Sequence, residues 1–274
     1  MSEPTLINSQ AADYKEEKIN GVHSPLLNRN VDINVLTPAA MTSSLYPLLL
    51  LNDGQDMEGL RMKNTVEELV RRKQIPPIII VGIVAADRMQ EYGVASRKDY
   101  LERGSRAKAY SAYISNELFP FLRHRYPIST EPAQRVIAGC SMGGLSALDI
   151  AWNRPDLFEK VGAFSGSFWW RKRNSNSMFY SDHRDRLMHQ EIRNGKKKEN
   201  LKFWLQTGVL DEIGDRNKNG VIDSIDDTLD LIAELTKKGY RPHDIQYVEM
   251  KEGRHNLETW AEVMPVFLQW AFGN

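Results

Sequence analysis

Residues 139–144 read Gly139-Cys140-Ser141-Met142-Gly143-Gly144, and they follow the apolar run Arg135-Val136-Ile137-Ala138. The residues after them, 145–151, favour a helix. A β-branched strand therefore runs into Gly-x-Ser-x-Gly and then into a helix, the order typical of a nucleophile elbow. Glycines beside Ser141 leave room for a sharp turn, and the helix N-terminus directs free N–H groups toward the reacting oxygen. The alternative is a plain turn, because glycine and serine are common in turns.

Apolar runs on both sides of this motif predict further strands. They cover residues 31–36, 46–51 and 77–84 before it, and 161–164, 201–206 and 245–250 after it. Continuous apolar runs suit strands buried on both faces of a parallel sheet, whereas residues 31–36 alternate as a half-exposed edge strand does. Helical patterns separate the runs, around residues 66–70, 107–122, 229–235 and 260–267. The alternation predicts one domain over residues 1–274 with the α/β-hydrolase fold, a mostly parallel central sheet with helices on both faces.

Composition narrows the function classes. The 274 residues carry 36 basic and 36 acidic side chains, so a nucleic-acid or anionic-membrane binder, which normally has a basic excess, is disfavoured. Cys140 is the single cysteine, so no intrachain disulfide forms. No apolar run approaches the roughly 20 residues that span a bilayer. The polar start, residues 1–4, has no apolar signal core, and we expect a cytoplasmic protein, or an exported one if a signal was removed.

One segment breaks the alternation of strands and helices. Residues 171–200 are polar and rich in arginine and lysine. We expect a solvated excursion with one short helix. The alternative is a mobile cap that lies over the site and contacts substrate.

A serine nucleophile needs a base, and the base needs an orienting carboxylate. In α/β-hydrolases these follow in the order Ser, Asp or Glu, His, each after a strand. His255 follows the strand 245–250 after a loop containing Gly253 and precedes the last helix, so it is the predicted base. The alternative is a surface-loop histidine. The other histidines stand elsewhere: His23 precedes the serine, His124 ends a helical pattern, His183 and His189 lie in the polar segment, and His243 precedes the last strand.

Asp211 follows the strand 201–206 and is the predicted triad acid. Glu212 competes for this role, and a solvated loop carboxylate is the third reading. An oxyanion hole needs two backbone N–H groups near the developing charge. We expect one from Met142 and the other from Gln55, with Gly54 as the second choice for that donor.

Residues 215–226 match a calcium-binding loop. Oxygen side chains occupy loop positions 1, 3, 5, 9 and 12, glycine is at 6 where the chain must turn, and apolar Ile222 is at 8. Asp226 stands at position 12, where a bidentate glutamate is usual, which would weaken affinity or favour magnesium. The alternative is an Asx-rich turn capping a helix that starts near Asp226 or Asp227. The predicted ligands of this structural ion are Asp215, Asn217, Asn219, Val221, Asp223 and Asp226.

Together these features resemble the esterase family of α/β-hydrolases that includes feruloyl and acetyl-xylan esterases, enterochelin esterases, S-formylglutathione hydrolase and mycolyltransferases. The resemblance covers residues 13–272. It is carried by residues 51–55, 87–92, the elbow, 165–170 and 253–256 with Trp260. It implies the same Ser141, His255 and Asp211 triad and supports Gln55. By the same resemblance Trp169 and Trp170 face substrate, with core packing as an equal alternative, and Arg88 and Glu91 form a structural or substrate-binding pair at the mouth. The calcium-type loop is not general to this family.

The combined prediction is a serine carboxylesterase that forms an acyl-enzyme and needs no cofactor for catalysis. A small-molecule or carbohydrate ester is the expected substrate, with no nucleic acid and no membrane span; the oligomeric state is not predicted. An acyltransferase with the same triad, a peptidase and a catalytically inactive carbohydrate-binding relative are the rival readings. Fold alone does not select the substrate.

Overall fold

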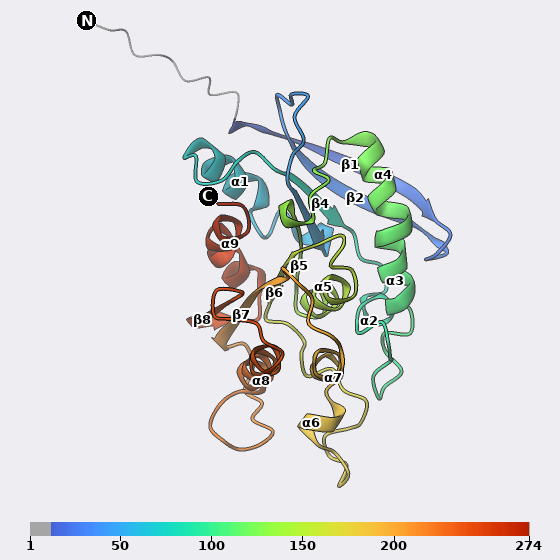
Figure 1. Ribbon diagram of the computed structural model, residues 1–274, viewed down its shortest axis with the longest axis vertical. Coiled ribbons are helices and arrows are strands. Elements are labelled where there is room, and N and C mark those ends of the chain that lie inside the picture. The colour runs from blue at the N-terminus through green and yellow to red at the C-terminus, as the bar shows by residue number, and fades with distance from the viewer. Residues whose placement is uncertain (1–11, 274) are drawn as a thin grey trace, which may run out of the picture.

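The computed structural model describes residues 12–273 and places them around one eight-stranded sheet (Figure 1). The strand order is β1-β2-β4-β3-β5-β6-β7-β8, in which β1, β2 and β4 pair antiparallel and all later neighbours pair parallel. The predicted α/β-hydrolase fold with a mostly parallel sheet is confirmed. The strands are β1 (Tyr14–Ser24), β2 (Arg29–Pro38), β3 (Leu48–Asn52), β4 (Ile79–Ile83), β5 (Arg135–Cys140), β6 (Lys160–Phe164), β7 (Lys202–Leu210) and β8 (Ile245–Arg254).

Helices cover both faces of the sheet (Figure 1). The apolar faces of α1 and α9 pack into one core, while α3, α4, α5, α7 and α8 contribute to a second core on the other face. A π-helical turn at Ile114–Leu118 joins α3 to α4. Within residues 12–273, no helix is long and apolar enough to cross a bilayer. The helices are α1 (Met62–Arg71), α2 (Arg88–Glu91), α3 (Ala107–Tyr113), α4 (Phe119–Arg125), α5 (Met142–Asn153), α6 (Asp182–Asp185), α7 (Leu187–Asn194), α8 (Asp223–Lys237) and α9 (Leu257–Phe272).

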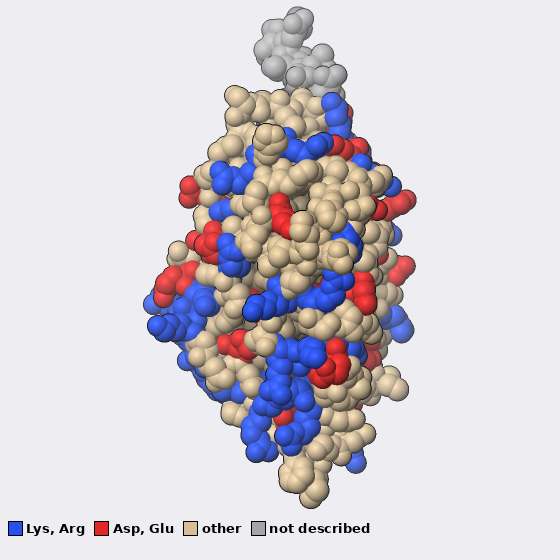
Figure 2. Space-filling model, turned by 90° about the vertical axis from the view of Figure 1, so that its right-hand side faces the viewer, with Lys and Arg blue, Asp and Glu red and all other residues tan. Residues whose placement is uncertain are grey.

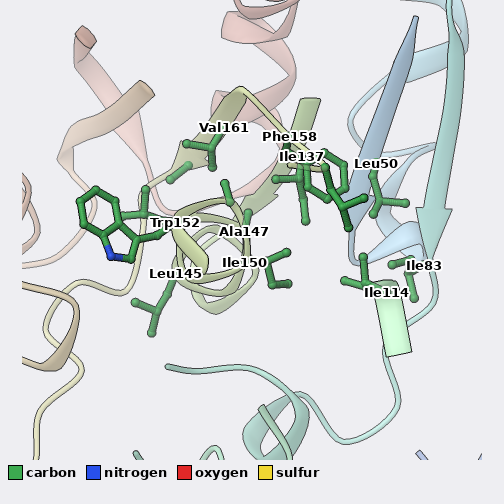
Figure 3. Close-up of a cluster of buried hydrophobic side chains, with 14 of the residues drawn as sticks. Leu50, Ile83, Ile114, Ile137, Leu145, Ala147, Ile150, Trp152, Phe158 and Val161 are labelled. Carbon is green, nitrogen blue, oxygen red and sulfur yellow. The ribbon is translucent and has the colours of Figure 1, made fainter. Parts of the chain in front are cut away.

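Strand β3 shows why its sequence is continuously apolar. Leu48 and Leu50 belong to the second core, and Leu49 and Leu51 belong to the first. Successive strand residues point to opposite faces, so a strand covered on both sides needs apolar residues throughout. Figure 3 shows the second core, where Leu50, Ile137 and Val161 from three adjacent strands meet side chains of α5.

The N-terminal strands differ from the prediction. One edge of the sheet is β1, a strand that the sequence analysis did not predict. Strand β2 lies between β1 and β4, with Val31, Ile33 and Val35 fully buried. The expectation of an edge strand at residues 31–36 was therefore wrong. Strand β1 is largely exposed and rich in charge, as an edge that resists further pairing tends to be.

The polar segment 171–200 is less solvated than expected. It holds two short helices, α6 and α7, and one face of α7 buries Leu187, Met188 and Ile192 in the second core. Arg186 is buried too, where it pairs with Asp227 and Asp230 of α8. Figure 2 shows lysine and arginine gathered in the lower half of one face, at the height where Figure 1 places α6. The spacing of the apolar residues in α7 places them on one helix face, and this face is buried even though the surrounding sequence is rich in charge.

The elbow helix α5 is buried along almost its whole length and carries a carboxyl group, Asp149. Asp149 accepts hydrogen bonds from Ala95 N–H (3.0 Å) and from the Asn153 amide. Burial nonetheless raises the pKa of Asp149 to about 7. The folded protein therefore retains this proton after the unfolded chain has released it, and the stabilisation from this group is lost as the pH rises toward 7.

We expect the free energy of unfolding to fall between pH 5 and pH 8 by roughly 2 kcal/mol more in the wild type than in Asp149→Asn. Asparagine does not ionise, so any hydrogen bond lost through the substitution costs the same at pH 5 and pH 8. This cost cancels when the pH-dependent change of the variant is subtracted from that of the wild type. Urea titrations of both proteins at the two pH values measure it. Equal pH dependence in the two proteins would show that Asp149 ionises normally.

Candidate active site

Ser141 lies between β5 and α5 in a strained backbone conformation, with φ 56° and ψ −122°. Its N–H donates to the Phe164 carbonyl at the end of β6 (2.8 Å). A Cβ atom at Gly139 would lie closer than 3.0 Å to the Gly143 backbone, and one at Gly144 would lie 2.9 Å from the Gly139 carbonyl oxygen. The predicted strand, sharp turn and helix are therefore present, and two of the glycines are required by close backbone contact.

Two serines that the sequence analysis did not assign to the site lie close to its predicted residues, Ser167 beside Ser141 and Ser165 in the cavity that His255 lines. The Ser167 hydroxyl is 3.3 Å from the Ser141 hydroxyl, and Ser167 N–H donates to the Ser141 carbonyl (3.1 Å). Ser165 accepts a hydrogen bond from the indole N–H of Trp260 (3.0 Å). Both follow the C-terminal end of β6, a position that could have indicated them, because parallel strands end at one edge of a sheet.

His255 is held between β8 and α9. Strand β8 runs through Gly253 to Arg254, so the loop expected before His255 is absent, and the histidine follows the strand directly. The residues expected to form that loop instead belong to β8, at a shift in its register with β7. The two strands approach so closely there that a Cβ at Gly208 would lie under 3.0 Å from Gly253. The imidazole packs edge-on against Trp260, with ring centroids 5.1 Å apart.

Asp211 lies just beyond β7, with one carboxylate oxygen fixed and the other free. Oδ2 accepts from Gly208 N–H (3.0 Å), whereas Oδ1 is buried and has no hydrogen-bond partner among residues 12–273. Asp211 and His255 line one cavity of about 80 Å³. A buried oxygen without a donor is costly, which favours a donor such as an imidazole N–H in the working enzyme. The other lining residues are Ser165, Gly166, Trp169, Glu212 and Ser224.

One of the two acid candidates contributes to the electrostatics of His255. Burial lowers the pKa of His255, the Asp211 carboxylate acts to raise it, and the Arg88 guanidinium lowers it further. Glu212 lines the same cavity, and partial burial beside Asp223 raises its pKa.

A base must be neutral to accept a proton, so a lowered pKa of the predicted base, His255, has a kinetic consequence. We expect kcat/KM for p-nitrophenyl butyrate to fall on the acidic side with a midpoint below the usual histidine value of about 6.5. A pH–rate profile between pH 4.5 and 8 measures this midpoint. A midpoint above 7 would mean that Asp211 outweighs burial at this imidazole.

The segment predicted to carry the second oxyanion donor follows β3. Asp53 adopts φ 61° and ψ 55°, and a single 3₁₀ turn at Gly54–Asp56 follows it. A Cβ at Gly54 would lie closer than 3.0 Å to the Gly82 backbone of β4, so the turn needs glycine there. Within residues 12–273, the N–H groups of Met142 and Gln55 donate no hydrogen bond, as donors reserved for an oxyanion would.

The four predicted substrate-binding residues fare differently. Trp169 is partly buried and lines the cavity, whereas Trp170 is fully buried in the second core, so its predicted contact with substrate is corrected. Arg88 is half-exposed and binds both carboxylate oxygens of Asp53 (2.7 and 3.0 Å). Glu91 is buried and pairs with Arg29 (2.7 Å). The expected Arg88–Glu91 pair does not form, because each side chain has a nearer partner from a distant segment.

Cys140 is the last residue of β5 and directly precedes Ser141. Its thiol is buried, and burial raises its pKa well above the ordinary value. Since the thiolate is the reactive form, this thiol is held unreactive in the folded protein.

The predicted calcium ligands are only partly brought together. Asp215 accepts from the N–H groups of Asn219 and Gly220, and Gly220 turns with φ 87°. Asp226 accepts from the side-chain amides of Asn217 and Asn219. Asp223 instead begins α8 and pairs with Arg216 (3.0 Å). Across residues 12–273, no group of three or more His, Cys, Asp or Glu side chains is arranged to hold a metal ion.

Comparison with known proteins places the chain. The family model described as "Putative esterase" matches residues 24–271. The chain belongs to this esterase family. This family member is 27% identical over 188 residues to the Iron(III) enterobactin esterase of Escherichia coli K12, covering 68% of the chain and 43% of that protein.

Two further similarities extend the picture. The Ag85A diacylglycerol acyltransferase/mycolyltransferase of Mycobacterium leprae is 28% identical over 145 residues, which cover 53% of this esterase family member and 42% of that protein. The solved structure of a ferulic acid esterase superposes with a TM-score of 0.72 at 18% identity, covering 95% of the chain and 98% of that structure. The chain thus spans less than half the length of these two curated relatives, while its fold covers nearly all of the ferulic acid esterase.

Proposed function

We propose that this chain is a serine carboxylesterase with Ser141 as nucleophile, His255 as base and Asp211 as the acid. Membership of the esterase family supports ester hydrolysis as the chemistry. The observation that carries the residue assignment is the strained φ of 56° at Ser141, at the sheet edge where Asp211 and His255 line one cavity. A non-glycine residue in such a conformation costs roughly 1–3 kcal/mol, and such strain clusters at active sites.

In the proposed mechanism the Ser141 hydroxyl turns from Ser167 to His255 and gives up its proton as its oxygen attacks the ester carbonyl carbon. The carbonyl oxygen becomes an oxyanion that accepts from the N–H groups of Met142 and Gln55. Asp211 orients the imidazole and stabilises its charged form. Collapse expels the alcohol, which takes the proton from His255, and leaves an acyl-enzyme. Water activated by His255 then releases the acid.

The substrate we propose is a small-molecule ester or a carbohydrate ester. Enterobactin and ferulic acid esterases among the similar proteins support this class. Trp169 lines the cavity beside His255 and offers an aromatic surface to an acyl or alcohol group.

Hydrolysis of p-nitrophenyl butyrate by the wild type and Ser141→Ala tests the proposal. We expect turnover by the wild type, a loss of about 10³-fold or more in the variant, and fluorophosphonate labelling of the wild type alone. A wild type that neither turns over nor labels would overturn the proposal and favour an inactive binding protein.

Similarity to the mycolyltransferase makes acyl transfer the second candidate. Adding an alcohol acceptor separates the two, because an acyltransferase makes ester in preference to free acid.

We also propose that the loop 215–226 binds a calcium ion that stiffens the segment after Asp211. The turn at Gly220 and the Asp215 carboxylate, which accepts from two N–H groups of the loop, support this proposal, although Asp223 would have to leave Arg216 to join the ligands. Saturating calcium should raise Tm by about 5 °C over EDTA. Asp215→Ala should lose this difference, and equal Tm values for the wild type in calcium and EDTA would contradict the proposal.

A further inference from the structure

We propose that Asn52 is a positioning residue for the oxyanion hole, because its side-chain amide ties the segment carrying Gln55 to the helix that begins at Met142. This inference rests on the proposed function. The two N–H donors belong to segments some ninety residues apart, Asn52 and Gly143 being separated by 91 positions. Both donors must converge on one oxygen, so a direct bond between their segments has a catalytic consequence.

The amide of Asn52 uses both of its ends. Asn52 is the last residue of β3 and is buried. Its Nδ2 donates to the Gly143 carbonyl oxygen in the first turn of α5 (2.7 Å). Its Oδ1 accepts from the Tyr110 hydroxyl of α3 (2.8 Å). A carbonyl can only accept, so the amide has one orientation, and Tyr110 locks it there.

The two segments also touch directly. A Cβ atom at Gly143 would lie 2.7 Å from Asp53 Oδ2 and 3.2 Å from Asn52 Cβ. On the other side of this segment, the backbone of Gly54 lies against Gly82 of β4. Residues 52–55 therefore lie in close contact with β4 on one side and α5 on the other, and the Asn52 amide donates the hydrogen bond that joins them to the helix.

A second layer of buried tyrosines backs this arrangement. The Tyr92 hydroxyl accepts from Asp53 N–H (3.0 Å), and the Tyr92 and Tyr110 rings meet edge to face with centroids 5.3 Å apart. Burial raises the pKa of both phenols well above 10, so Tyr110 keeps its hydroxyl proton over the working pH range. The donor to Asn52 is therefore permanent.

The experiment compares Asn52→Ala and Tyr110→Phe with Tyr113→Phe as the matched control. Tyr113 is buried next to Tyr110, but its hydroxyl has no partner among residues 12–273, so its loss breaks no hydrogen bond. Two quantities are measured: kcat and KM for p-nitrophenyl butyrate per site titrated by fluorophosphonate, and Ki for butylboronic acid. The tetrahedral boronate on Ser141 places an oxygen in the oxyanion hole.

Asn52→Ala should lower kcat by about 10- to 100-fold, leave KM within about 2-fold, and raise Ki by a factor similar to the loss in kcat. Tyr110→Phe should move kcat and Ki the same way by about 3- to 10-fold. Tyr113→Phe should change neither. A merely structural role would reduce the number of titratable sites without moving Ki.

Unchanged kcat and Ki in folded Asn52→Ala would overturn the inference while Ser141-dependent turnover kept the proposed function. If Asn52→Ala does not fold, Tyr110→Phe decides in its place, and values equal to those of Tyr113→Phe would overturn the inference. Absence of Ser141-dependent turnover in the wild type would instead overturn the proposed function, and the positioning role with it.

Discussion

Replacing His255 by alanine should lower kcat/KM for p-nitrophenyl butyrate by about 10⁴-fold or more. In the proposed mechanism His255 is the base for Ser141, and without a base an alcohol is a poor nucleophile at neutral pH. A loss of this size corresponds to about 5.5 kcal/mol of transition-state stabilisation. The fold should survive, because His255 is exposed and its main packing partner is Trp260. Steady-state kinetics and circular dichroism measure the two effects.

The matched control is His243→Ala, because His243 is an exposed histidine ahead of the same strand. It should change kcat/KM by less than about 2-fold, as surface substitutions away from a site do. The double variant Ser141→Ala/His255→Ala should be no slower than Ser141→Ala alone, because the two residues act as one unit. If His255→Ala kept a tenth of the activity, another group would have to be the base.

Gly139→Ala should lower the free energy of unfolding by about 3 kcal/mol and kcat by about 100-fold. The added Cβ would overlap the backbone of Gly143, which cannot rotate away as a side chain could. Relief of this overlap requires the start of α5, and Met142 with it, to move relative to β5. Urea denaturation measures the change in the free energy of unfolding, and turnover per titrated site measures the change in kcat that the displacement causes.

Gly220→Ala separates this steric effect from the general effect of replacing a glycine. Gly220 has φ 87° and open space around its missing Cβ, so we expect a cost of about 1 kcal/mol in EDTA and no change in kcat. Equal stability losses in the two variants would show that the contact between Gly139 and Gly143 is not what the elbow requires.

Strands β3 and β4 were predictable because they are buried at every position. The runs at residues 46–51 and 77–84 are continuously apolar for that reason; β4 lies within the second run, and β3 covers most of the first and ends one residue beyond it, at Asn52. The first strand was not predictable, since β1 is held by backbone pairing to β2 and exposes most of its side chains. Its charged sequence carries little periodicity from which a strand could be inferred.

The order of strands and helices also indicated that Ser141, Asp211 and His255 follow the C-terminal ends of parallel strands, β5, β7 and β8, at one edge of the sheet. Ion pairs between residues far apart in the sequence could not be predicted in this way. Glu91 pairs with Arg29, 62 positions away, and Arg88 pairs with Asp53. Nothing in the sequence of residues 88–91 indicates either partner. Trp169 and Trp170 are adjacent and chemically identical, and the sequence alone does not say which of them lines the cavity.

The single thiol of the chain gives this protein an intrinsic probe of one core beside the elbow. Cys140 directly precedes Ser141 and is buried in the core that α1 and α9 cover, on the face of the sheet opposite α5. A disulfide reagent therefore reaches it when this core opens, and its rate of modification divided by the rate for a free thiol is the equilibrium constant for that local opening. The opening can be measured without an engineered label and without a substrate.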